Sequence, residues 1–315
     1  TRGTGSCHQG SVAVTHAPGK RLAMEIKKLL FVTKFNDLSF NALQSLLSLR
    51  KAGLTHVVFV NVIEREKVAM HRGLGYQKAE EIRLRETANI RFIDWAEHLF
   101  EQGMEVGVYI VVGNLVSQIV EATRKEQADL VVIGHSSKRL LDQLYSGSDI
   151  TELIRRTSVP VLVYKPPTDK IDLLDKPFER PLLATDWSAA GKQAEKLLMP
   201  LKGVVNNIDI IHVADEKDLK GSAMQIQKLR KQTRAKLDSI ADRFEDNSIE
   251  ARAHVYIGDP LEEIERAAAD CQSSMIVLGS SSRSAWKERW LGSLPRAIAE
   301  NSDYPTLIVP PPLSD

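Results

Sequence analysis

The sequence predicts an α/β fold in which one doubly wound unit occurs twice. Short runs that are apolar enough for strands buried on both faces alternate along the chain with stretches of helical periodicity. The same series then returns in the same order, at an offset of 145 to 152 residues. Strands that alternate with helices form parallel sheets covered by helices. We therefore expect two repeated domains, each a five-stranded parallel sheet flanked by helices.

In the first half, five apolar runs predict the strands of one sheet. They lie at Leu29–Val32, Val57–Val60, Val106–Val112, Leu130–Ile133 and Val161–Val163. Helical spacing predicts the covering helices at Asp37–Ala52, Gln77–Gln102, Leu115–Lys125 and Asp149–Arg156. Gly53 and Gly103 follow the first two of these helices, as is typical of helix ends. In the long second helix we expect one apolar face formed by Ile82, Ile90, Ile93, Trp95 and Leu99.

The second half repeats every strand of the first. The corresponding runs are Leu182–Asp186, Ile210–Val213, Val255–Gly258, Met275–Gly279 and Pro305–Val309. Residues 166–179 between the halves are polar and rich in proline, which predicts a linker between domains at 26–165 and 180–312. Residues 1–25 lack both helical periodicity and the apolar stretch of a signal peptide, and we expect a disordered leader there.

Composition narrows the class of protein further. The 315 residues include 42 basic and 41 acidic side chains, and the hydrophobic share of 43% excludes disordered and fibrous classes. Apolar runs fall short of the roughly 18 residues of a membrane span, and basic residues are scattered among acidic ones, so we expect neither membrane insertion nor nucleic-acid binding. Two cysteines, Cys7 and Cys271, favour a reducing, cytoplasmic compartment. The halves carry net charges of +4 and −3, which favours docking of one domain on the other.

The most informative motif follows the fourth strand of each half with identical spacing. It reads Gly134-x2-Ser137-x9-Gly147-Ser148 in the first half and Gly279-x2-Ser282-x9-Gly292-Ser293 in the second. A glycine at a strand end lets backbone approach a ligand closely, and a Gly-Ser pair at a helix start offers N–H groups and a hydroxyl to a phosphate. A tight strand exit followed by an ordinary serine cap would give the same residues.

With this motif and strand order, the chain resembles the universal stress protein family. The family motif is Gly-x2-Gly-x9-Gly-Ser/Thr after the fourth strand, and both halves match it except at Ser137 and Ser282. The resemblance covers about residues 27–311. It implies a tandem member of the family, in a five-stranded α/β fold, whose two domains pair partly through their last strands.

The resemblance also implies a site for an adenine nucleotide, ATP or AMP, in the second half. In the family members that bind nucleotides, an acidic residue after the first strand contacts the nucleoside and a valine after the second strand meets the base. These positions hold Asp186 and Val213 here. The phosphates would lie on the motif residues Gly279, Ser282, Gly292 and Ser293, with the Ser282 hydroxyl as a donor. Lys34 replaces the acidic residue in the first half, and Asp149 there would repel phosphate.

Several alternatives remain open at the level of sequence. The chain could be an interaction scaffold for protein partners that has lost nucleotide binding, as Lys34, Ser137 and Ser282 suggest. It could be a nucleotide hydrolase or nucleotidyl transferase, or could hold a small hydrophobic ligand between the domains. Trp286 and Trp290 could cover a ligand or pack in the loop. His135 lies in the first motif loop and could contact a ligand. The histidines lack metal-ligand spacing, and we expect Cys271 in the core and no bound metal.

Overall fold

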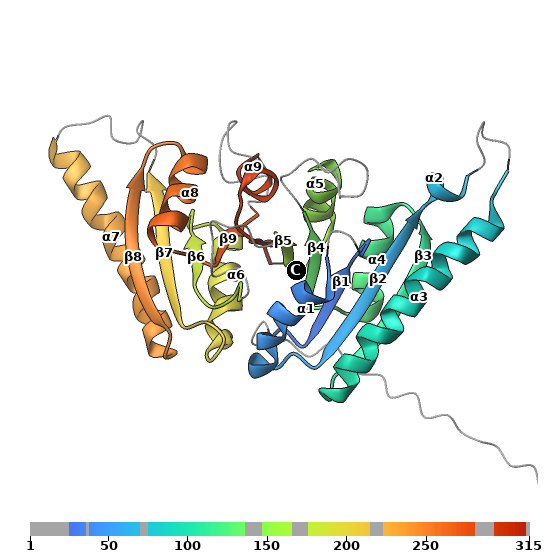
Figure 1. The fold of residues 1–315 in the computed structure, drawn as a ribbon. Helices are drawn as coiled ribbons and strands as arrows, with labels where there is room; N and C mark the ends of the chain where they lie inside the picture. Colours follow the sequence, from blue (N-terminus) through green and yellow to red (C-terminus); the bar gives the residue numbers. More distant parts are fainter. Residues whose placement is uncertain are drawn as a thin grey trace, which may run out of the picture.

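The computed structural model describes residues 25–35, 38–69, 75–135, 147–165, 176–214, 223–280 and 293–312 (Figure 1). The strands of the first half are β1 (Lys28–Val32), β2 (His56–Glu64), β3 (Glu105–Gly113), β4 (Leu130–Gly134) and β5 (Val161–Tyr164). Those of the second half are β6 (Pro181–Ala184), β7 (Asn207–Ala214), β8 (Glu250–Ile257), β9 (Met275–Gly279) and β10 (Thr306–Val309). Within the described ranges, all ten strands form one sheet, in the order β3-β2-β1-β4-β5-β10-β9-β6-β7-β8.

Each half of this sheet is parallel, and the halves join at their last strands. In both halves the first strand lies between the second and the fourth, so the strand order reverses there. Ligand sites of such sheets lie at the carboxyl ends of the strands beside this switch point. Strands β5 and β10 pair in the antiparallel direction, with Leu162 opposite Leu307. The predicted fold class, two repeated parallel units paired as an internal pseudo-dimer, is confirmed.

Helices cover both faces of the sheet. In the first half they are α1 (Phe40–Leu46), the 3₁₀ turn η1 (Leu47–Ala52), α2 (Arg65–Val68), α3 (Lys78–Glu101), α4 (Leu115–Glu126) and α5 (Gly147–Arg156). In the second half they are α6 (Ala189–Leu198), the 3₁₀ turn η2 (Met199–Leu201), α7 (Ala223–Asp246), α8 (Pro260–Asp270) and α9 (Ser293–Asn301). Helices α1, α3, α6 and α7 pack on one face, while α4, α5, α8 and α9 pack on the other.

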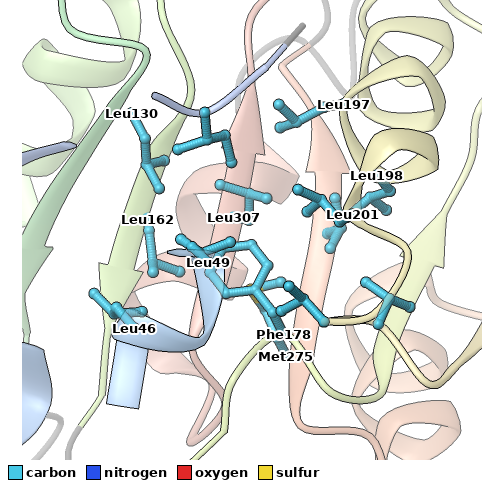
Figure 2. Packing of buried hydrophobic residues seen from close by; sticks show 14 of the residues in the cluster. Leu46, Leu49, Leu130, Leu162, Phe178, Leu197, Leu198, Leu201, Met275 and Leu307 are labelled. Atoms are coloured by element: carbon cyan, nitrogen blue, oxygen red, sulfur yellow. The ribbon is translucent and has the colours of Figure 1, made fainter. Parts of the chain in front are cut away.

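The buried core on the α1 and α6 face runs through both halves without a break. Figure 2 shows leucines from α1, η1, β4 and β5 meeting side chains from α6, η2, β9 and β10 across the junction of the halves. Leu162 and Leu307, which face each other across this junction, are fully buried. Burial of this apolar surface favours one shared core over two separate ones.

The buried face of the long helix α3 differs from the one predicted from the sequence. Trp95 and Leu99 are buried as expected, but Ile82, Ile90 and Ile93 are 46%, 70% and 51% exposed. The buried stripe is instead formed by side chains at helical spacing that include two alanines and two aromatic residues, namely Ala88, Phe92, Trp95, Ala96 and Leu99. The prediction for the three isoleucines is therefore wrong. Among the described residues, none of the helices has the length and apolar character needed to cross a membrane.

Candidate functional site

Three of the residues expected at a nucleotide site lie on neighbouring strands of the second half. Ala184 of β6 pairs with Ile211 of β7 on one side and with Leu278 of β9 on the other. Asp186 and Val213 each follow their paired residue by two positions, and Gly279 follows Leu278 by one. Neighbouring strands lie about 4.8 Å apart. The structure therefore brings Asp186, Val213 and Gly279 together at the carboxyl edge of the sheet.

Asp186 lies in a tight turn that leads into α6. Its Oδ1 atom accepts the backbone N–H of Ser188 at 3.0 Å, and Ser188 Oγ accepts the N–H of Gly191 at 3.1 Å. The carboxylate is half-buried beside the first turn of α6, where the helix dipole favours negative charge. Trp187, between the two acceptors, has a φ of +64°, so this turn holds a bulky residue in the left-handed region.

The same turn is built a second time in the first half. Phe35 there has a φ of +70°. Its N–H bonds Thr33 Oγ1 at 2.7 Å, just as the Trp187 N–H bonds Thr185 Oγ1 at 3.2 Å. The second strand supports each turn through the threonine carbonyl, which accepts from Asn61 in the first half and from His212 in the second. These bonds measure 2.9 Å and 2.8 Å. Lys34 therefore occupies the structural position that Asp186 occupies in the second half.

An aromatic pair beside Asp186 was not singled out by the sequence analysis. The ring centroids of Trp187 and His212 lie 5.0 Å apart with an interplanar angle of 34°, and Lys236 Nζ lies 5.4 Å from the Trp187 centroid. Because a carbonyl only accepts hydrogen bonds, the His212 bond to Thr185 requires a proton on Nδ1. The repeat could have identified Trp187, since the corresponding position of the first half, Phe35, is also aromatic.

Gly279 has a packing role that the sequence analysis did not anticipate. A Cβ atom at this position would lie 2.4 Å from the Gly191 nitrogen and 2.6 Å from the carbonyl carbon of Ala190. Both are backbone atoms of α6 and cannot move aside. The absence of a side chain is therefore needed for α6 to pack on β9, whether or not a ligand is bound.

The remaining motif residues are described only in part. Ser293 is the first residue of α9. Ser137, Ser282 and Gly292, like Trp286 and Trp290, lie outside the described residues. The predictions for these positions remain untested by the geometry.

The first half carries a different charge arrangement at the equivalent edge. Lys34 Nζ forms an ion pair with Glu64 Oε1 at 2.7 Å, and the lysine side chain is only 13% exposed. A pocket of about 210 Å³ lies there, with Lys34, Phe35, Asn61, Val62 and Arg91 in its wall. A nearby acidic side chain thus neutralises the cation that occupies the position of Asp186 in the first half.

Two further side chains named in the sequence analysis make contacts within the protein. His135, considered as a ligand contact, places Nε2 3.1 Å from the Glu300 carbonyl oxygen at the end of α9, and so bridges the two halves. Cys271, expected in the core, is half-buried: it follows α8 as its C-cap and packs against the apolar cluster on the α8 face of the sheet. Burial and the nearby charge of Asp209 raise the pKa of the Cys271 thiol to about 11. At neutral pH this thiol is protonated and a poor nucleophile.

The fold and the strand-end turn, which occurs once in each half, define a tandem α/β protein of two repeated units. The model of the universal stress protein family matches residues 25–165 and again residues 178–310. Together these matches span most of the chain, so the chain belongs to the universal stress protein family, as a tandem member.

Curated and solved relatives agree with this assignment. Universal stress protein MJ0577 of Methanocaldococcus jannaschii is 25% identical over 153 residues, which is 42% of this chain and 94% of the relative. Universal stress protein MJ0531 of the same organism is 26% identical over 144 residues, 45% of this chain and 83% of the relative. A solved universal stress protein from Archaeoglobus fulgidus superposes with a TM-score of 0.69 at 18% identity, covering 93% of this chain and 99% of that structure. This last likeness shows the fold.

Proposed function

We propose that the second half binds an adenine nucleotide, ATP or AMP, and that the chain acts in the stress response through binding rather than catalysis. The observation that carries this proposal is the meeting of Asp186, Val213 and Gly279 at the ends of three neighbouring strands. A carboxylate, an apolar side chain and a strand-end glycine at one edge match the hydroxyl groups, base and phosphates of a nucleotide.

Each of these residues would have a distinct part in binding. The Asp186 carboxylate, oriented by the Ser188 N–H, would accept hydrogen bonds from the ribose hydroxyls. Val213 would pack against the base. The start of α9 would offer backbone N–H groups to the phosphates, together with Ser282, Gly292 and Ser293 of the motif. Pro295, the third residue of α9, removes one such donor.

In the first half, we propose a scaffold role without nucleotide. The ion pair of Lys34 with Glu64 supports it, because a nucleoside would find neither a carboxylate acceptor at position 34 nor an uncompensated charge there. We further propose that residues 26–165 and 180–312 are the two domains, joined by a linker at 166–179, and that the protein works in the cytoplasm. The cysteine content supports a reducing compartment.

Titration calorimetry with ATP and with AMP tests the nucleotide site. We expect Asp186→Ala to weaken binding at least about tenfold, since it removes hydrogen bonds to a charged group. The matched control is Lys34→Ala, the same position in the first half, which should leave the affinity unchanged. Gly292→Val should also weaken binding. Equal affinities for the wild type, Asp186→Ala and Gly292→Val would overturn the proposal.

A second measurement separates binding from catalysis. The purified chain is incubated with ATP, and ADP is quantified over time. We expect ATP to be recovered intact. ADP that accumulates with the wild type but not with Asp186→Ala would instead identify a nucleotide hydrolase that uses the proposed site.

A further inference from the structure

A carboxylate, an imidazole and a thiol meet in the second half, beside the C-terminal end of α8. Asp209 is the third residue of β7, and its Oδ1 atom lies 3.0 Å from Nε2 of His254 on β8. Cys271, the C-cap of α8, lies beside the Asp209 carboxylate. One ligand atom from each of the three residues lies within 4.8 Å of the other two. The cluster lies near the amino end of β7, away from the proposed nucleotide site.

The repeat shows that the fold does not require these side chains. When the two halves are aligned, Asp209 corresponds to Val58, His254 to Tyr109, and Cys271 to Glu126. Val58 is a fully buried apolar residue, and Tyr109 donates a hydrogen bond to Glu126. Asp209 is only 5% exposed. Burial of a carboxylate costs several kcal/mol unless partners compensate it, so a buried acid in place of a valine indicates a use other than packing.

The ligand set points to a particular class of ion. One sulfur, one imidazole nitrogen and one carboxylate oxygen form a borderline-soft set that suits zinc and similar transition metals, whereas magnesium and calcium prefer oxygen alone. Zinc bonds of about 2.0–2.3 Å place tetrahedral ligand atoms roughly 3.5 Å apart. Asp209 Oδ1 and His254 Nε2 already lie within this distance, and Cys271 Sγ lies within 4.8 Å of both ligand atoms, so a small movement of the thiol would complete the set. The His254 side chain is 39% exposed, which gives an ion access from solvent.

We propose that Asp209, His254 and Cys271 form a site for a divalent transition metal ion of the zinc type, with a fourth position open to water or another ligand. Tyr256 lies next to Cys271. Its hydroxyl donates to Asp270 Oδ2 at 3.5 Å and would instead donate to a metal-bound thiolate. The first half offers Val111 at the position of Tyr256. Sequence spacing hides this site, because Asp209 and His254 are 45 residues apart and meet only through the pairing of β7 with β8.

Cobalt(II) titration of the full chain without nucleotide tests the site. We expect a thiolate-to-cobalt charge-transfer band that saturates at one equivalent and disappears when zinc is added. Cys271→Ser should abolish the band and lower zinc affinity at least about 100-fold. Cys7→Ser is the matched control and should leave both unchanged. A band that is absent from the wild type, or that depends on Cys7 instead of Cys271, would overturn the proposal.

Asp209→Val separates a loss of metal binding from a loss of folding. It installs the residue that the first half uses at this position, so we expect the apo protein to be at least as resistant to urea as the wild type. The same variant should lose the zinc-induced rise in melting temperature. If Asp209→Val keeps the wild-type response to zinc, the assignment of Asp209 as a ligand is wrong.

Discussion

At position 279, the packing of α6 on β9 requires glycine even in the absence of a ligand. A methyl group there would press into the backbone of α6 at 2.4 Å from the Gly191 nitrogen. We predict that Gly279→Ala destabilises the protein by about 3 kcal/mol, the upper part of the range for overpacking. Urea denaturation measures this.

Gly113→Ala provides the comparison, because the nearest atoms to its Cβ would belong to the flexible Gln118 side chain, at 2.9 Å. We expect the cost of this second change to be clearly smaller. Equal costs for the two changes would show that α6 can shift, and that Gly279 is not fixed by packing. In that case a loss of nucleotide binding in Gly279→Ala could be assigned to the ligand contact itself.

Lys165, which follows β5, makes stability depend on pH. Its Nζ donates to the Ser302 carbonyl at 2.8 Å, and its side chain is almost fully buried. Burial lowers the pKa of Lys165 from 10.5 to about 8, although Asp303, Glu265 and Glu300 act in the opposite direction. Between these two pH values the unfolded chain binds a proton that the folded chain does not bind. Stability from this lysine is therefore gained as pH rises from about 8 toward 10.5 and lost as pH falls through 8.

We predict that Lys165→Met removes this contribution. The free energy of unfolding of the wild type, measured relative to that of the variant, should rise between pH about 7.5 and pH about 10. The comparison between variant and wild type cancels the titration of other groups. A constant difference across this range would contradict the shifted lysine.

At the scale of elements, the two halves cap equivalent helices differently. Ser188 caps α6 through its side chain, which accepts the Gly191 N–H at 3.1 Å, whereas Ser39 at the start of α1 makes no such side-chain bond. We predict that Ser188→Ala costs about 1 kcal/mol and that Ser39→Ala costs close to nothing. Thermal or urea denaturation of both variants checks this, and similar losses would mean that the capping bond does not stabilise α6.

The elements also show how far sequence alone reaches. Strands were predictable because runs such as Leu130–Ile133 are buried on both faces and carry no competing pattern. The buried face of α3 could not be predicted, because isoleucines such as Ile90 are apolar but exposed, while Ala88 is buried in the core. Asp186, Val213 and Gly279 could be assigned to one site through the family resemblance, and the pairing of their strands places them at one edge of the sheet. The cluster of Asp209, His254 and Cys271 could not be predicted, because it depends on the register of β7 with β8 and on where α8 ends.

For the whole molecule, duplication produced one structure with two unequal edges. The antiparallel pairing of β5 with β10 makes the sheet continuous, and His135 and Lys165 add bonds from the first half to the end of α9 and the residue that follows it. The halves share a fold but differ at matched positions, with Lys34 against Asp186 and Val58 against Asp209. The halves thus differ both at the carboxyl edge of the sheet, at Lys34 and Asp186, and at a buried position within it, at Val58 and Asp209.

This shared core predicts that the two halves unfold together. Leu43 in α1 and Leu237 in α7 are both fully buried in the one cluster that runs through the junction. Separate domains commonly give separate transitions, but a core common to both should couple them. We predict a single calorimetric transition whose calorimetric and van't Hoff enthalpies agree. Leu43→Ala and Leu237→Ala, each costing about 2–5 kcal/mol, should each lower the temperature of that whole transition. If either change instead splits the transition, so that one part moves and the other stays, the core does not couple the halves.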